Sequence, residues 1–226
     1  MVFIFLLIII GAIVYFKMVA DPKDVKERCK GRNADQKQVI RYFMLDGCLR
    51  KTMSDAEYDA KVQAFANRLN AREKAMNKIG LDESELREIE PVHFEGYRFY
   101  QGEKYFGRRG KDGIWRSSVY EISWLFFSST QVYLYQYRFN MDEDGKKEIT
   151  EEYFYKDINS LSTSSDTVET PYWSPKEKKM LLENVNSNRF KLGVSGEQFY
   201  CAMEQNDYTE KAIQGMKAKL REKKNA

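Results

Sequence analysis

Residues 119–158 read VYEISWLFFSSTQVYLYQYRFNMDEDGKKEITEEYFYKDI. Aromatic and β-branched side chains dominate this stretch, and such side chains favour extended strands over helix. Residues typical of turns interrupt it twice, at 128–130 and at 142–145. The stretch therefore predicts three consecutive antiparallel strands at the centre of the fold.

Both faces of these predicted strands carry large side chains, because successive residues of a strand point to opposite faces. A sheet of this kind needs cover on both sides, from a second sheet, a barrel closure or a packed helix. The tyrosines are expected to bury their rings and to extend their hydroxyls to the rim, which makes them core rather than a ligand platform. In the first of these strands, one face carries Tyr120, Ile122, Trp124 and Phe126, and the other carries Leu125 and Phe127. In the next strand, one face carries Tyr133, Tyr135, Tyr137 and Phe139, and the other carries Val132 and Leu134.

The charge of the 226-residue chain is distributed unevenly, although its net value is only +3. Residues 1–80 carry a net charge of +6, residues 81–208 carry −7, and residues 209–226 carry +4. The acidic segment contains the predicted strands, which argues against the sheet as a platform for nucleic acid or anionic lipid. We expect no nucleic-acid partner.

Residues suited to catalysis or metal binding are scarce. His93 is the single histidine, and the three cysteines, Cys29, Cys48 and Cys201, have no C-x-x-C spacing. No zinc site, histidine-based triad or cofactor is therefore expected, and the thiols are predicted to be reduced. The acidic residues show no diagnostic pairing, since Glu151 and Glu152 point to opposite faces of one strand. A non-enzymatic protein is predicted, with a carboxylate-dependent hydrolase as the weaker alternative.

An apolar run opens the chain, VFIFLLIIIGAIVYF at residues 2–16, and residues 18–20 extend it to about the length of a membrane-spanning helix. A cleaved signal peptide or a buried core helix is the alternative. However, no cation precedes Lys17, and residues 18–20 match a cleavage site poorly. Residues 1–20 are thus predicted to be a single-pass anchor in the plasma membrane. The cations that follow place the rest of the chain in the cytoplasm; they are Lys17, Lys23, Lys26, Arg28, Lys30 and Arg32.

Residues 21–90 are predicted to form a juxtamembrane helical region. A first helix starts at Asp21-Pro22, and a helical hairpin follows, with helices at 34–50 and at 54–79. The second helix has a capping box at Ser54 and Glu57 and a stop at Gly80. Its apolar seam is expected to pack on the preceding helix, with the sheet or a second copy of the chain as alternatives. The seam consists of Tyr58, Val62, Phe65, Leu69, Met76 and Ile79.

Residues 91–226 are predicted to form a separate β domain with a C-terminal helix. After a strand at 92–100, residues 101–116 form a glycine-rich basic loop, where backbone amides and cations would stabilise a phosphate. The candidate ligand-binding residues are Lys104, Arg108, Arg109 and Lys111. The loop matches neither common phosphate-binding motif, so hairpin turns with solvated charges are the better interpretation.

The C-terminal third is predicted as short elements. They are a strand at 160–163, a proline-bounded segment at 171–175 that is excluded from a central strand, and a hairpin of strands 180–185 and 189–194. Ser195 and Gln198 resemble a capping box, so the terminal helix is expected from about residue 199, with a break at Asn206-Asp207.

A family resemblance rests on three strand patterns, residues 124–127, residues 131–133 and the Tyr-x-Asp-Ile step within EYFYKDI at 152–158. They resemble patterns in uncharacterised bacterial membrane-anchored proteins with a pleckstrin-homology-like (PH-like) domain. The resemblance implies an α+β fold, in which an antiparallel barrel or sandwich of about seven strands is capped by the C-terminal helix. Such domains bind lipids, peptides or proteins.

The function predicted from these features is that of a single-pass, membrane-anchored, cytoplasm-facing binding or scaffold protein. Its expected partner is another protein or a second copy of the chain. The alternative is a module that binds anionic lipid through the glycine-rich basic loop or the basic tail.

Overall fold

The computed structural model of the chain describes Gly11 and residues 20–45, 52–86 and 90–225. Except for Gly11 and Ala20, the predicted anchor lies outside these residues, as does Cys48. In the described part of the chain, no helix is long and apolar enough to cross a membrane. The α-helices are α2 (Lys23–Arg28), α3 (Ala34–Met44), α4 (Asp55–Leu69), α5 (Ala71–Ile79) and α6 (Asp207–Asn225), and two 3-10 turns are η1 (Glu83–Leu86) and η2 (Tyr155–Asp157).

The strands pair into two sheets, so the fold is mixed α+β. The four-stranded sheet has the order β1-β4-β5-β6, and the five-stranded sheet has the order β3-β2-β7-β8-β9. No strand pairing among the described residues joins them into a closed barrel, so the barrel form of the prediction is wrong. The strands are β1 (Val92–Tyr97), β2 (Gly107–Arg109), β3 (Trp115–Ser117), β4 (Val119–Phe127), β5 (Gln131–Asn140), β6 (Lys146–Phe154), β7 (Ile158–Ser174), β8 (Lys179–Val194) and β9 (Glu197–Ala202).

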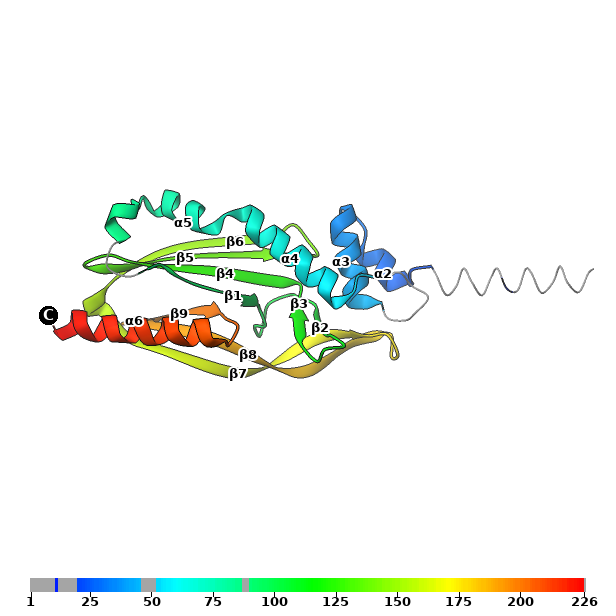
Figure 1. Cartoon of the computed structure of the whole chain (residues 1–226). Helices are drawn as coiled ribbons and strands as arrows, with labels where there is room; N and C mark the ends of the chain where they lie inside the picture. The colour runs from blue at the N-terminus through cyan, green and yellow to red at the C-terminus, as the bar shows by residue number, and fades with distance from the viewer. Residues whose placement is uncertain (1–10, 12–19, 46–51, 87–89, 226) are drawn as a thin grey trace, which may run out of the picture.

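The four-stranded sheet is the middle layer of the molecule (Figure 1). Helices α4 and α5 cover one of its faces, and the five-stranded sheet together with α6 covers the other. Tyr120, Ile122 and Phe126 pack in the core under the helices, whereas Leu125 and Phe127 pack in the core that includes α6. The predicted three-stranded meander is thus confirmed. Burial on both faces is confirmed for β4 and β5, whereas the residues of β6 are half-buried or exposed.

The predicted helix at 54–79 is two helices in the structure. Its capping box is confirmed, but Asn70 adopts a left-handed conformation with φ 46° and separates α4 from α5. Gly80, with φ 80°, ends α5 as predicted. The seam packs on both the preceding helix and the sheet, because Tyr58 stacks on Tyr42 of α3 at 4.5 Å between ring centroids and Phe65 lies 4.4 Å from Phe139 of β5.

The C-terminal third differs most from the prediction. Strands β7 and β8 form one continuous antiparallel ribbon. β7 includes residues 171–174 of the proline-bounded segment. The predicted hairpin of strands 180–185 and 189–194 is wrong, because β8 continues through residues 186–188 without a turn. Pro171 is tolerated because β8 flanks β7 on one side, while on the other side β2 is registered with β7 only at Tyr172. Residues 195–198 form a turn and the start of β9 rather than a helix cap. The helix α6 starts at Asp207, after the reciprocal cap of Asn206 and Thr209.

Candidate functional site

The four cations of the predicted basic loop have different surroundings in the structure. Arg108 donates to the carbonyl oxygens of Tyr42 and Leu45, the latter at 2.9 Å, and thereby satisfies the last turn of α3. Its guanidinium also lies 4.7 Å from the centroid of the Tyr42 ring. Arg109 and Lys111 are exposed on the β2–β3 hairpin, and Lys104 lies before β2. Arg108 thus supports α3, whereas Lys104, Arg109 and Lys111 are exposed.

Acidic side chains of the same chain hold this hairpin in place. The buried Arg116 of β3 forms ion pairs of 2.7 Å with Asp59 of α4 and with Asp112 of the hairpin turn. Hydrogen bonds from Arg116 lower the pKa of Asp112 to about 2. The Lys111 backbone amide donates to Asp55 at 2.9 Å. This part of the basic loop is therefore anchored to the start of α4.

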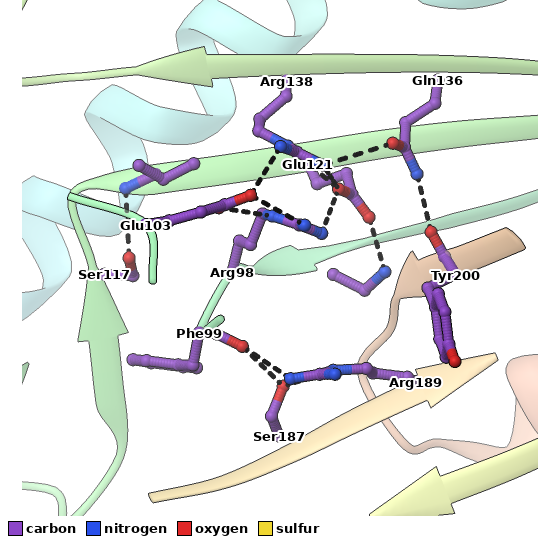
Figure 2. Close-up of polar contacts among 12 residues, drawn as sticks. Arg98, Phe99, Glu103, Ser117, Glu121, Gln136, Arg138, Ser187, Arg189 and Tyr200 are labelled. Carbon is purple, nitrogen blue, oxygen red and sulfur yellow. Dashed lines mark hydrogen bonds and ion pairs between the residues drawn. The ribbon is translucent and has the colours of Figure 1, made fainter. Parts of the chain in front are cut away.

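A second group of charges lies between the sheets, and Figure 2 shows how its side chains converge. We call Arg98, Glu103, Glu121 and Arg138 the buried ion-pair cluster. Arg98 is 2.7 Å from Glu121 and 2.8 Å from Glu103, and Arg138 is 2.8 Å from Glu103 and 3.2 Å from Glu121. The Glu121 side chain is fully buried, so groups of the protein must supply the interactions that water would otherwise provide.

The buried ion-pair cluster connects the two sheets. Glu121 on β4 uses its second oxygen to accept the backbone amide of Ala202 on β9 at 2.7 Å. Burial alone would raise the pKa of Glu103, but the hydrogen bond from Arg98 and the charges of Arg98 and Arg138 lower it overall. Each carboxylate oxygen of the cluster has a donor. The cluster is therefore built for structural support and offers no free base.

Our sequence interpretation missed this cluster, although a signal was present. Alternation places Glu121 on the same face as Leu125 and Phe127, and it places Arg138 on the face of Val132 and Leu134. In the structure Glu121 and Arg138 are direct cross-strand partners. Opposite charges on facing positions of two buried strands indicate a buried ion pair.

A third region is an open cleft of about 560 Å³ between α3, α4 and the β5–β6 turn, which we call the α3–α4 cleft. Phe65 of α4 lies in it with 39% of its surface exposed, against the buried ring of Phe139. The cleft contains charges of both signs, which belong to Asp35, Lys61, Arg68, Glu143, Asp144 and Lys146.

Hydrogen bonds between elements give the α3–α4 cleft its shape. Gln36 of α3 donates to Asp144 of the turn at 2.6 Å, and Lys61 of α4 pairs with Asp35 of α3 at 2.6 Å. Arg32 pairs with Glu143 at 2.8 Å. These contacts connect the three elements that line the cleft.

Other reactive side chains occupy positions outside this cleft. His93 stacks on Trp124 at 4.9 Å and lies 3.1 Å from the Tyr208 hydroxyl. Burial raises the pKa of the Cys29 and Cys201 thiols, which disfavours the reactive thiolate. Within the described ranges, no group of three or more His, Cys, Asp or Glu side chains is placed to hold a metal ion.

Comparisons with models of protein families, with curated proteins and with solved structures found no match for this chain. The resemblance to PH-like membrane-anchored proteins therefore stays a prediction.

Proposed function

We propose that this chain is a single-pass, membrane-anchored, cytoplasm-facing binding protein that captures a segment of another protein in the α3–α4 cleft. The observation that carries the proposal is Phe65, a large aromatic side chain that stays 39% exposed in a helix whose other seam residues are more buried. Aromatic side chains at the centre of a concave site are the residues that most often dominate a protein interface.

The surroundings of Phe65 favour an ordered binding site over a loose surface. Phe139, on which it rests, belongs to the central sheet, so the floor of the cleft is rigid. Gln36, Asp144 and the Lys61–Asp35 pair join the elements around it. A preformed site loses little conformational entropy when it binds a partner.

Charge defines the kind of partner that would fit. The cleft presents Lys61 and Arg68 of α4 and Lys146 of β6, together with Asp35 and Asp144. A protein segment with an apolar side chain flanked by charges of both signs would complement this arrangement. We therefore propose that a segment of a second protein occupies the α3–α4 cleft, and that the chain acts by binding rather than by catalysis.

Sequence features support the membrane location. Residues 2–16 are continuously apolar, and six cations follow within residues 17–32, as expected for an anchor whose following domain faces the cytoplasm. The cleft would then recruit its partner to the inner membrane surface.

The test uses the full chain in its native membrane with a photo-crosslinking amino acid at position 65. The same amino acid at Ile114, an exposed apolar residue of the β2–β3 turn, is the control. Mass spectrometry identifies the segment that crosslinks from position 65 but not from position 114. That segment is then synthesised and titrated against the detergent-solubilised chain.

We expect Phe65→Ala to weaken binding of this peptide by about 10- to 100-fold, as for a central interface aromatic. The charge reversals Lys61→Glu and Arg68→Glu should also weaken it, whereas Ile114→Ala should leave the Kd unchanged. Equal affinity for Phe65→Ala and the unmodified chain would refute the proposal. So would crosslinks from position 65 that reach only lipid or a second copy of the chain.

A further inference from the structure

The end of the β7–β8 ribbon carries exposed apolar side chains. We call residues 171–182 the ribbon tip. Leu182 is 63% exposed and Met180 is 38% exposed. The strand register pairs Trp173 with Met180 and Pro171 with Leu182, so these four residues share one face. No element described in the structure buries Leu182.

The ribbon tip lies at the same end of the molecule as α2, and the C-terminus lies at the opposite end (Figure 1). A hollow of about 300 Å³ between them is lined by Trp173 and Met180 from the tip, by Met44, and by Asp24, Glu27 and Arg28 from α2. The tip is therefore next to the first helix that follows the predicted anchor.

Chain length restricts how far α2 can be from the membrane. The predicted anchor ends at Ala20 and α2 begins at Lys23, and three residues span at most about 10 Å. If residues 1–20 cross the membrane, α2 lies within about that distance of the headgroups. The ribbon tip, which adjoins α2, is then near the same surface.

The composition of the tip suits that location. The turn of the ribbon, residues 175–179, carries exposed lysines at 176, 178 and 179, and its one acidic residue, Glu177, is 2.9 Å from Lys179. Lysines attract anionic headgroups, and exposed aliphatic side chains favour the interfacial layer. The tip combines both kinds of side chain within residues 171–182.

We infer that the ribbon tip rests on the anionic membrane surface, with Leu182 and Met180 in the interfacial layer and Lys176 and Lys178 on lipid headgroups. This inference rests on the proposed anchor. It adds a second attachment point beside α2, so the domain has one orientation on the membrane. The end that carries the C-terminus then points away from the lipid.

The experiment places an environment-sensitive fluorophore at position 182 of the full chain, through Leu182→Cys in a variant that lacks Cys29, Cys48 and Cys201. The chain is reconstituted into phosphatidylcholine vesicles with or without phosphatidylserine. Quenching by doxyl-labelled lipid reports lipid contact, and quenching by iodide reports contact with water. Tyr208→Cys, which labels an exposed aromatic position at the start of α6, is the matched control.

We expect doxyl lipid to quench position 182 but not position 208, and phosphatidylserine to strengthen this quenching. Each of the substitutions Lys176→Glu and Lys178→Glu should lower the ratio of bound to free tip by at least about fivefold, the effect of one cation near an anionic surface. The same charge change on α6, by Lys211→Glu and Arg221→Glu, should have no effect at position 182.

Extraction of the vesicles with alkaline carbonate separates the two ideas. Release of the chain into the supernatant would mean that the proposed anchor fails. A chain that stays in the membrane while iodide, and not doxyl lipid, quenches position 182 would overturn the ribbon-tip inference alone. Protection from both quenchers would also overturn it, because a protein surface, such as a second copy of the chain, would then cover the tip.

Discussion

The two faces of the four-stranded sheet satisfy their buried polar groups with different kinds of side chain. Under the helices, tyrosine rings fill the core, and their hydroxyls hydrogen-bond to neighbouring side chains or to a backbone carbonyl. Toward the five-stranded sheet, four full charges meet in the buried ion-pair cluster. The tyrosine contacts are Tyr42 to Asp55 at 2.9 Å, Tyr58 to the Ser117 carbonyl at 2.8 Å, Tyr97 to Asp59 at 2.6 Å, Tyr120 with Gln63 at 3.0 Å and Tyr135 to Glu148 at 2.8 Å.

The two faces differ in how far each polar contact depends on its neighbours. Burial raises the pKa of Tyr58 and Tyr97, which keeps both hydroxyls protonated as donors. Removal of one such hydroxyl affects one hydrogen bond. Removal of Glu121, by contrast, takes away the carboxylate that accepts from Arg98, from Arg138 and from the backbone amide of Ala202. A buried charge that loses its partner destabilises the folded state strongly.

The largest predicted effect is therefore that of Glu121→Leu, which should lower the free energy of unfolding by about 3–5 kcal/mol. Urea denaturation followed by circular dichroism measures it. Glu121→Gln, which keeps an acceptor oxygen, is the control and should cost less. A loss below about 1 kcal/mol for Glu121→Leu would show that the two faces are energetically alike.

An intermediate effect is predicted for Tyr58→Phe on the helix-covered face. The substitution leaves the ring stack with Tyr42 in place but removes the donor to the Ser117 carbonyl. The expected loss is about 1–3 kcal/mol, the range for a buried acceptor left without its donor. The same urea experiment applies. A loss equal to that of Glu121→Leu would contradict the view that the tyrosine contacts act singly.

The smallest predicted effect is a gain in stability. Asp142, in the turn between β5 and β6, has a buried oxygen, Oδ1, with no hydrogen-bond partner among the residues that the structure describes. Burial raises its pKa above the ordinary value of 3.8. Asp142→Asn removes the buried negative charge, and we expect it to increase the free energy of unfolding at neutral pH by about 1 kcal/mol.

The pH dependence of that gain follows from the direction of the shift. Because the folded-state pKa of Asp142 is raised, the folded chain holds this proton more tightly than the unfolded chain. The cost of ionisation is therefore fully present above the folded-state pKa, and it disappears as the pH falls to the ordinary pKa of the unfolded chain. The advantage of Asp142→Asn should therefore shrink as the pH falls from neutral toward about 4. Stability curves of both chains across this range measure it, and a gain that grows on acidification would contradict the assignment.

The candidate site was only partly predictable. Phe65 was assigned to an apolar seam, and the helix pattern correctly placed it on the packing face of α4, but its exposure depends on the gap that α3 and the β5–β6 turn leave above it. The basic loop had a recognisable composition. The role of its arginines was not visible, because the carbonyl oxygens that accept from Arg108 belong to Tyr42 and Leu45. One of the two carboxylates that pair with Arg116 belongs to Asp59 of α4, which is also far away in sequence.

The local sequence was sufficient for features with a short-range cause. Alternation of side chains within residues 119–158 specified three strands with two buried faces, and the capping pattern at Ser54 and Glu57 specified where α4 begins. The β7–β8 ribbon and the buried ion-pair cluster depended on three-dimensional contacts. β7, with the sequence INSLSTSSDTVETPYWS, has little apolar alternation of its own and is a strand because β8 pairs along nearly its whole length. Likewise, Glu121 can be buried only because Arg98, Arg138 and the Ala202 amide, from three other parts of the chain, converge on it.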